Sequence, residues 1–192
     1  MKHLEPNRLI LIGASTGGPR DIKNILKSIS QEFRSSIIIA QHMGDEYMES
    51  FASHMSSNTH LKVKVAQDGE FLQCQTVYIA SKICHVVKNR ESLSFKITTS
   101  KEENYNPNIN ELFISCSHFS KNMDVLACIL TGIGDDGAKG MLALSKTGSV
   151  CLSESKESAA VYGMPLRAQE VSKKVKVQSL NEIIKTINSF GA

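Results

Sequence analysis

Short apolar runs alternate with segments of helical period along most of the chain. The segment from Ile22 to Ile29 carries isoleucine or leucine at positions i, i+3, i+4 and i+7, which places them on one face of a helix. The run from Leu9 to Ile12 is continuous and apolar, as expected of a strand that is buried on both faces. Further strands are predicted at 36–40, 63–66, 77–80, 124–132, 149–153 and 175–177, and further helices at 45–55, 109–116, 141–144, 156–163 and 181–190.

The boundaries of two of these helices have specific signals. Asp45 is the expected cap of the second helix, because a carboxylate accepts hydrogen bonds from the free amides of a first turn. Gly163 and Pro165 are expected to end the helix at 156–163, since glycine and proline are common at and beyond helix ends.

The segment from His85 to Ile97 has a different pattern. Apolar and polar residues alternate on both sides of a polar turn near Asn89–Ser92, which predicts an antiparallel hairpin. Elsewhere the alternation of strands and helices predicts an α/β fold, a doubly wound and mostly parallel sheet with helices on both faces. No repeat or linker divides the chain, so we expect a single domain over residues 1–192.

Composition narrows the function classes. A chain of 192 residues with 41% hydrophobic content suits one domain with a substantial core. The net charge of +3, the aromatic content of 6% and the lack of tryptophan give no support for a nucleic-acid partner. The five cysteines form no Cys-x-x-Cys pair, and no apolar run approaches the roughly 20 residues of a membrane span. We therefore expect a cytoplasmic protein with no membrane insertion.

Candidate chemistry gathers where the predicted strands end. Ligands of doubly wound sheets bind beyond the carboxyl ends of the strands. Ser15 follows the first predicted strand, His42 follows the second, and Asp135 and Asp136 lie in the loop after the run 124–132. A hydroxyl, an imidazole and a carboxylate are the components of a nucleophile, its general base and the acid that orients the base.

The glycine-rich turn around the serine favours the same chemistry. The backbone amides from Thr16 to Gly18, including that of Gly17, are expected to hold a developing oxyanion at the start of the following helix. The segment from Gly13 to Gly17 also matches the Gly-x-Ser-x-Gly nucleophile elbow of α/β-hydrolases. That fold places its acid before its histidine in the chain, whereas the order here is serine, histidine, aspartate, so we expect a different fold.

A dinucleotide-binding enzyme is the main rival from another class. The glycine-rich turn resembles that of short-chain dehydrogenases, and Tyr78 and Lys82 reproduce their Tyr-x-x-x-Lys spacing. Those two residues share a helix face in that class, but Tyr78 lies in a strand-like run, where residues four apart are separated by about 13 Å. The third glycine of the dinucleotide motif is also missing, and we reject this interpretation.

Five motifs together are far more specific than any of them alone. The stretches LIGASTGGP, IIIAQHM, VYIA, LTGIGDDGAKGM and SAAVYGMP occur in an order and spacing that resemble the catalytic domain of the CheB family, the chemotaxis protein-glutamate methylesterases. The resemblance covers residues 9–169. It implies a serine hydrolase that removes methyl esters from glutamyl side chains of methyl-accepting chemoreceptors, with release of methanol. Many members also deamidate receptor glutamines.

The resemblance also implies roles for individual residues. Ser15 corresponds to the nucleophile, His42 to its base and Asp136, directly before glycine, to the acid in place of Asp135. Thr16 and Ile133 line the same cleft. Ile133 stands where the family commonly has methionine, a change in the wall of the cleft. The histidines show no metal-ligand spacing, and we expect neither a metal nor a cofactor.

Two alternatives remain, one about a regulatory domain and one about catalytic activity. Members of the family typically carry an N-terminal receiver domain, which is not present in this sequence. Either the chain is a fragment of a longer protein or the natural protein lacks a receiver, and we expect a separate regulatory protein as a partner beside the chemoreceptors. The alternative to an enzyme is an inactive chemotaxis scaffold of the same fold. The intact set of Ser15, His42 and Asp136 argues against that alternative.

Overall fold

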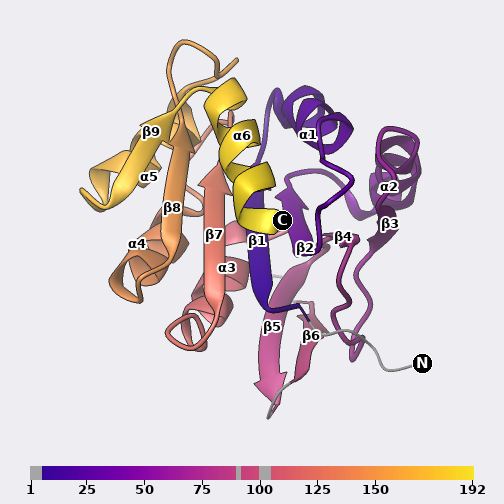
Figure 1. Cartoon of the computed structure of the whole chain (residues 1–192). Helices are drawn as coiled ribbons and strands as arrows, with labels where there is room; N and C mark the ends of the chain where they lie inside the picture. The colour runs from indigo at the N-terminus through magenta and orange to yellow at the C-terminus, as the bar shows by residue number, and fades with distance from the viewer. Residues whose placement is uncertain (1–5, 90–91, 100–104) are drawn as a thin grey trace.

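The computed structural model describes residues 6–89, 92–99 and 105–192. Strands and helices alternate through most of this length (Figure 1). In chain order the elements are β1 (Arg8–Ala14), α1 (Gly18–Lys27), β2 (Ser36–Gln41), the 3₁₀ turn η1 (Asp45–Tyr47), α2 (Met48–Ser56), β3 (Lys62–Val65), β4 (Thr76–Ile79), β5 (Ile83–Asn89), β6 (Ser92–Thr98), α3 (Ile109–Ser117), β7 (Asp124–Ile129), α4 (Ala138–Lys146), β8 (Val150–Glu154), α5 (Gly163–Glu170), β9 (Val175–Gln178) and α6 (Leu180–Gly191).

The main sheet has seven parallel strands in the order β3-β4-β2-β1-β7-β8-β9. From β1 the chain builds one side of the sheet and then returns to build the other side from β7. The strand order therefore reverses at β1, which lies between β2 and β7 in Figure 1. Such a reversal opens a crevice beyond the carboxyl ends of the strands.

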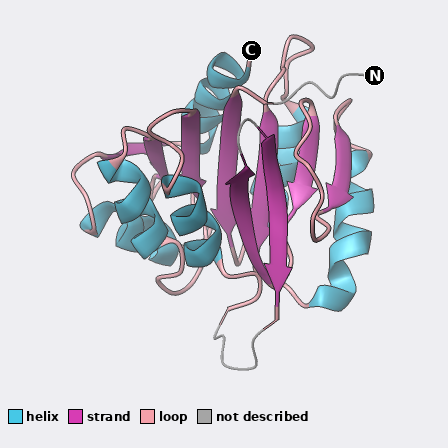
Figure 2. Ribbon diagram, turned by 90° about the horizontal axis from the view of Figure 1, so that it is seen from below, coloured by secondary structure: helices cyan, strands magenta, loops and turns pink. Residues whose placement is uncertain are grey.

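Each face of the sheet buries its own core. Leu9 and Leu11 of β1 point to one face, and Ile10 and Ile12 point to the other, as the two-residue period of a strand requires. Helices α3, α4 and α5 and the β5–β6 hairpin cover the first face, and α1, α2 and α6 cover the second. The hairpin crosses in front of the sheet in Figure 2. The predicted fold class is thus confirmed.

The hairpin is antiparallel, as predicted, and its strands pair with His85 opposite Lys96 and Asn89 opposite Ser92. Its turn at residues 90–91 lies outside the described residues. The strand β6 is held at its other side by the segment before β4, since the amide of Leu72 donates to the carbonyl of Leu93.

The helix predicted at 156–163 is wrong. Residues 155–162 form turns in which the amides of Ser158 and Ala159 both donate to the carbonyl of Ser155, and α5 begins at Gly163. Pro165 lies in the first turn of α5, where the missing amide hydrogen of proline costs no hydrogen bond. Proline therefore marks the start of a helix here instead of the end of one.

The cap predicted at Asp45 is also wrong. Gly44 precedes the 3₁₀ turn η1, which begins at Asp45 itself, and α2 follows from Met48. The carboxylate of Asp45 accepts a hydrogen bond from the side chain of Asn106 at 3.0 Å. Asp45 therefore ties the segment after β2 to the segment before α3.

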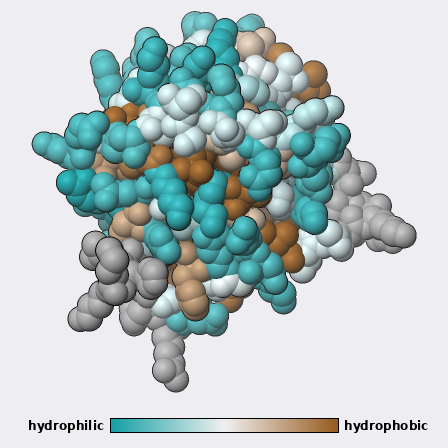
Figure 3. Space-filling model, turned by 90° about the vertical axis from the view of Figure 1, so that its right-hand side faces the viewer, coloured by the Kyte–Doolittle hydropathy of each residue, from teal (hydrophilic) through white to brown (hydrophobic). Residues whose placement is uncertain are grey.

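The surface is mixed in character. Figure 3 shows the side that lies to the right in Figure 1, where hydrophilic side chains surround a broken band of hydrophobic ones. None of the helices in the described ranges combines the length and the hydropathy that crossing a membrane requires.

Candidate active site

Ser15 and His42 leave adjacent strands at the same edge of the sheet. Ala14 of β1 lies opposite Gln41 of β2 in the parallel register, so the next residue of each strand comes out at one level. The amide of His42 donates to the carbonyl of Ala14 at 2.9 Å. The amide of Ser15 donates in the other direction, to the carbonyl of Thr131 beyond β7, also at 2.9 Å. The backbone of the serine thus lies between the exits of β2 and β7.

Gln41 fastens the serine and histidine segments together. Its side chain is 2% exposed, and its Nε2 atom donates to the carbonyl of Ser15 at 2.9 Å and to that of His42 at 3.1 Å. No role for Gln41 was predicted from the sequence. Its signal was a polar side chain at the end of an otherwise apolar strand, directly before the candidate histidine.

The carboxylate of Asp136 lies against the imidazole. Its Oδ2 atom is 2.8 Å from Nε2 of His42, and the residue is 1% exposed. The same carboxylate accepts hydrogen bonds from three backbone amides, those of Ile109 at 2.8 Å, Asn110 at 2.9 Å and Gly137 at 2.9 Å. Two of these amides belong to the first turn of α3, whose partial positive charge favours an anion. The start of α3 therefore stabilises the ionised carboxylate beside the histidine.

The hydrogen bond to Asp136 determines which ring nitrogen of His42 is available. With Nε2 as the donor to the carboxylate, the neutral ring carries its lone pair on Nδ1. Within the described residues Nδ1 has no hydrogen-bond partner. Nδ1 is therefore the ring nitrogen that Asp136 leaves unoccupied.

Tyr105 lies on the ring of the histidine. The two ring centroids are 5.1 Å apart with 10° between the planes, and the phenol donates to Oδ1 of Asp135 at 3.1 Å. Burial, followed by the hydrogen bond to Asp135, raises the pKa of Tyr105. Asp135 is exposed and contacts the tyrosine, whereas its neighbour Asp136 contacts His42. The structure thus gives the two adjacent aspartates separate partners.

Only two of the three backbone amides expected to hold an oxyanion are free in the glycine-rich turn of the described structure. The amide of Gly18 donates to the carbonyl of Ser15 at 2.9 Å, so it is not available to an oxyanion, and that expectation is corrected. The amides of Thr16 and Gly17 donate no hydrogen bond to any part of the chain that the structure describes. Gly17 has a φ of 89°, a conformation that glycine adopts at little cost.

Ile133 lies at the rim of the same region. A Cβ atom added at Gly132 would come within 2.7 Å of the Cβ of Ser15, so the backbone after β7 passes directly beside the serine. Ile133 follows in the chain and is 64% exposed. Its side chain is therefore exposed next to the backbone that passes Ser15.

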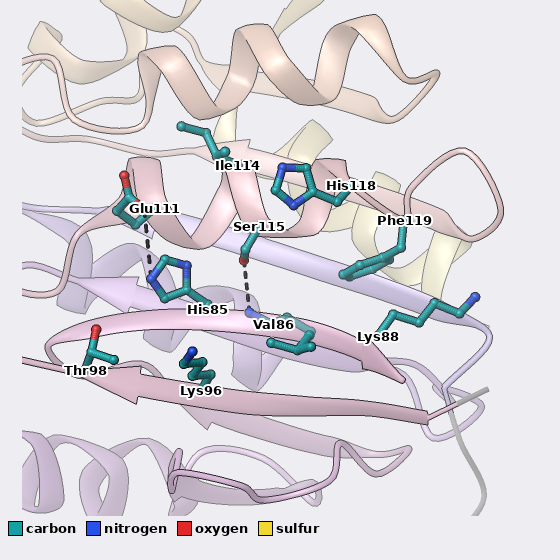
Figure 4. Close-up of a pocket in the computed structure, with 11 residues that line it drawn as sticks. His85, Val86, Lys88, Lys96, Thr98, Glu111, Ile114, Ser115, His118 and Phe119 are labelled. Carbon is teal, nitrogen blue, oxygen red and sulfur yellow. Dashed lines mark hydrogen bonds and ion pairs between the residues drawn. The ribbon is translucent and has the colours of Figure 1, made fainter. Parts of the chain in front are cut away.

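A groove with a volume of about 560 Å³ lies away from these residues, between the β5–β6 hairpin and α3 (Figure 4). His85 points across it toward Glu111, with 3.9 Å between Nε2 and Oε2, and the hydroxyl of Ser115 accepts from the amide of Val86 at 2.9 Å. None of the six predicted site residues lines this groove. Across residues 6–89, 92–99 and 105–192, no group of three or more His, Cys, Asp or Glu side chains is arranged to hold a metal ion.

The fold and the site together define a doubly wound α/β domain with a serine, a histidine and an aspartate at the carboxyl edge of its central strands. The family described as CheB methylesterase matches residues 10–187. The chain belongs to this family.

Individual relatives support the same assignment. A protein-glutamate methylesterase/protein-glutamine glutaminase of Caldanaerobacter subterraneus is 37% identical over 167 residues, which are 84% of this chain and 46% of the relative. The protein of the same name from Oceanobacillus iheyensis is 36% identical over 180 residues, 91% of this chain and 51% of the relative. The chain thus spans about half the length of these curated relatives. The crystal structure of the Thermotoga maritima CheB methylesterase catalytic domain superposes with a TM-score of 0.88 and 28% identity, covering 97% of this chain and 98% of that one.

Proposed function

We propose that this chain is a single catalytic domain that demethylates glutamyl methyl esters on chemoreceptors and releases methanol. The observation that carries the proposal is the hydrogen bond between His42 and Asp136 at the strand exit next to Ser15. The names of the relatives support the substrate class, since they describe protein-glutamate methylesterases.

In the acylation half of the reaction, Nδ1 of His42 takes the proton of Ser15 as the serine oxygen attacks the γ-carbonyl carbon of the ester. Asp136 accepts the Nε2 hydrogen throughout and stabilises the imidazolium that forms. The amides of Thr16 and Gly17 stabilise the tetrahedral oxyanion. The intermediate then breaks its bond to the methoxy oxygen, which takes the proton from His42 and leaves as methanol.

In the deacylation half, water attacks the acyl carbon and gives its proton to His42. The histidine returns this proton to the oxygen of Ser15, and the receptor keeps a glutamate side chain. A glutamine side chain enters the same sequence with ammonia as the leaving group. The relatives are also named protein-glutamine glutaminases, and this supports deamidation as a second activity of the same site.

The same proposal covers location and partners. Chemoreceptor methylation helices are the substrates, and a separate regulatory protein acts on the domain. The site of action is the cytoplasm.

The test is methanol release from membranes that contain methylated receptors. Wild-type protein is expected to release methanol, and Ser15→Ala is expected to lower turnover by at least about 10⁴-fold, as loss of a triad nucleophile does elsewhere. Ser57→Ala is the matched control, because this exposed hydroxyl has only local partners, the carbonyl of His54 and the side chain of Asn58, in the described structure. A wild-type protein that releases no methanol at any pH between about 6 and 9 would favour the scaffold.

A further inference from the structure

A buried carboxylate that the proposed mechanism does not use lies behind the serine turn. Glu154, the last residue of β8, is 0% exposed. Its Oε2 atom accepts from the amide of Thr131 at 2.9 Å, and its Oε1 atom accepts from the hydroxyl of Ser158 at 2.8 Å. One side chain therefore joins the exit of β7 to the loop that precedes α5.

Thr131 in turn forms hydrogen bonds with the serine turn, at Ser15 and Thr16. Its carbonyl accepts from the amide of Ser15 at 2.9 Å, and its hydroxyl donates to the carbonyl of Thr16 at 2.8 Å. The hydroxyl also accepts from the amide of Val161 at 2.9 Å. Thr131 is itself 0% exposed, so water does not compete for these groups.

Thr131 holds two peptide groups of the serine turn, one on each side of the peptide between Ser15 and Thr16. The peptide between Ser15 and Thr16 carries the Thr16 amide that the proposed mechanism assigns to the oxyanion. Its neighbours on both sides are held by Thr131, through the amide of Ser15 and the carbonyl of Thr16. A shift of Thr131 therefore moves the nucleophile and an oxyanion donor together. Displacements of about 1 Å at such donors are costly in rate.

We propose that Glu154 is a positioning residue for the serine turn. Glu154 holds Thr131 in place, and Thr131 in turn orients Ser15 and the amide of Thr16. This inference rests on the proposed function, because the turn has a reaction to serve only if Ser15 is the nucleophile. Glu154 touches neither the substrate nor the reacting atoms. Its effect is expected on the rate of the chemical step, with little effect on substrate binding.

The experiment compares Glu154→Ala with Glu154→Gln. Alanine removes both hydrogen bonds, whereas glutamine keeps an acceptor for the Thr131 amide and a polar group for Ser158. We expect Glu154→Ala to lower kcat for methanol release by about tenfold or more with KM changed less than about twofold, and we expect Glu154→Gln to recover most of the rate. Glu157→Ala is the matched control, since this exposed carboxylate lies three residues further along the same loop.

A second readout separates positioning from folding and from the choice of substrate. A fluorophosphonate probe forms a bond from its phosphorus to the oxygen of Ser15 and releases fluoride, while the serine proton passes to His42. The labelling rate per folded molecule reports the reactivity of the serine without any receptor. Slow labelling of Glu154→Ala, restored in Glu154→Gln, supports the inference even if the wild-type protein releases no methanol, in which case only the esterase proposal fails. Unchanged labelling and unchanged kcat in folded Glu154→Ala would overturn the inference and leave the esterase proposal intact.

A third variant keeps the inference testable if Glu154→Ala does not fold. Thr131→Val has nearly the shape of the natural side chain but lacks the hydroxyl that bonds Thr16 and Val161. It is expected to slow labelling of Ser15 by severalfold in folded protein. A folded Thr131→Val protein with the wild-type labelling rate would contradict the proposed connection.

Discussion

Asp136 and Asp135 are chemically identical neighbours with different surroundings. Asp136 is buried and accepts hydrogen bonds from three backbone amides and from His42, so each of its oxygens has two donors. Asp135 is exposed, and its carboxylate accepts from the phenol of Tyr105. Of the two carboxylates, only that of Asp136 bonds to His42.

The two aspartates are expected to respond very differently to substitution by asparagine. In Asp136→Asn an NH₂ group would replace an oxygen that faces two donors, which disrupts the orientation of His42. We predict a loss in kcat of about 10⁴-fold. Asp135→Asn retains an acceptor for Tyr105 and is predicted to stay within about tenfold of wild type. Methanol-release kinetics measure both, and the reverse ranking would reassign the acid to Asp135.

The ring contact between Tyr105 and His42 leads to a second prediction about single residues. Its ring covers one face of the imidazole of His42, and such ring contacts contribute about 0.5–1.5 kcal/mol. Tyr105→Leu is therefore predicted to lower kcat/KM by about threefold to tenfold, whereas Tyr105→Phe keeps the ring and loses only the bond to Asp135. If the phenylalanine variant were as impaired as the leucine variant, the hydroxyl would be the functional group instead of the ring.

At the level of elements, the exit of β7 passes directly beside Ser15. The backbone at Gly132 lies beside Ser15 and also receives the amides of Gly163 and Met164, which begin α5. A side chain at Gly132 would collide with Ser15 and with Met164. The tight contact between β7 and β1 therefore depends on glycine at this position.

Gly132→Ala is predicted to lower kcat by more than about tenfold, because the added methyl group displaces Ser15. Gly148→Ala is the control. Gly148 has a φ of 93° with open space around it, so its alanine variant bears backbone strain of about 1–2 kcal/mol without a collision. Kinetics and thermal unfolding of the two proteins separate the effects. Equal kcat values would show that the contact with Ser15 does not matter.

Elements also show what the sequence can and cannot predict. The strands β1, β2 and β7 were predicted because their apolar runs are continuous, and the exits that carry Ser15 and His42 followed from them. The partners of Asp136 were not predicted, because Ile109 and Asn110 lie 27 and 26 residues away in the chain. Contacts of this kind depend on how α3 packs, and no local pattern encodes that.

The helix predicted at 156–163, in the loop before α5, was wrong for a different reason. Its residues have adequate helical propensity, and Gly163 and Pro165 look like signals that end a helix. The observed loop bonds to its surroundings instead, through Val161 to Thr131 and through Ser158 to Glu154. Tertiary hydrogen bonds outweighed local propensity at this point.

Across the whole molecule, two cores hold the central strands from both faces. β1, β2 and β7 are buried almost throughout, and each of the three ends in a residue or loop of the candidate site. Rigid strands below the site position these side chains before a substrate arrives. Besides Asp136, two further carboxyl groups are fully buried in the described structure, those of Asp21 and Glu154.

This pair predicts how stability depends on pH. Burial raises the pKa of both groups above their usual values of 3.8 and 4.5, and the charge of Asp21 raises that of Glu154 further. The contribution of the two groups to the free energy of unfolding is complete at pH values below their usual pKa. It is lost as the pH rises through their raised pKa in the folded protein. Asp21→Asn removes one of these charges, so its melting temperature relative to wild type is predicted to rise by a few degrees between about pH 4 and pH 8.

Thermal unfolding across this pH range measures the difference. Asp124→Asn is the matched control, because the side chain of Asp124 is 73% exposed and its partner Arg8 lies 3.8 Å away at the surface. A constant difference between Asp21→Asn and wild type at all pH values would show that Asp21 does not ionise with a raised pKa.

The most direct test of the account is covalent labelling of the serine by a fluorophosphonate, followed by mass mapping. We predict one adduct per chain on Ser15, with labelling slowed by at least about 10³-fold in His42→Ala, because the serine oxygen reacts only when its proton is removed. An adduct on another residue, or equal labelling in wild type and His42→Ala, would contradict the claim that Ser15, His42 and Asp136 work as one unit.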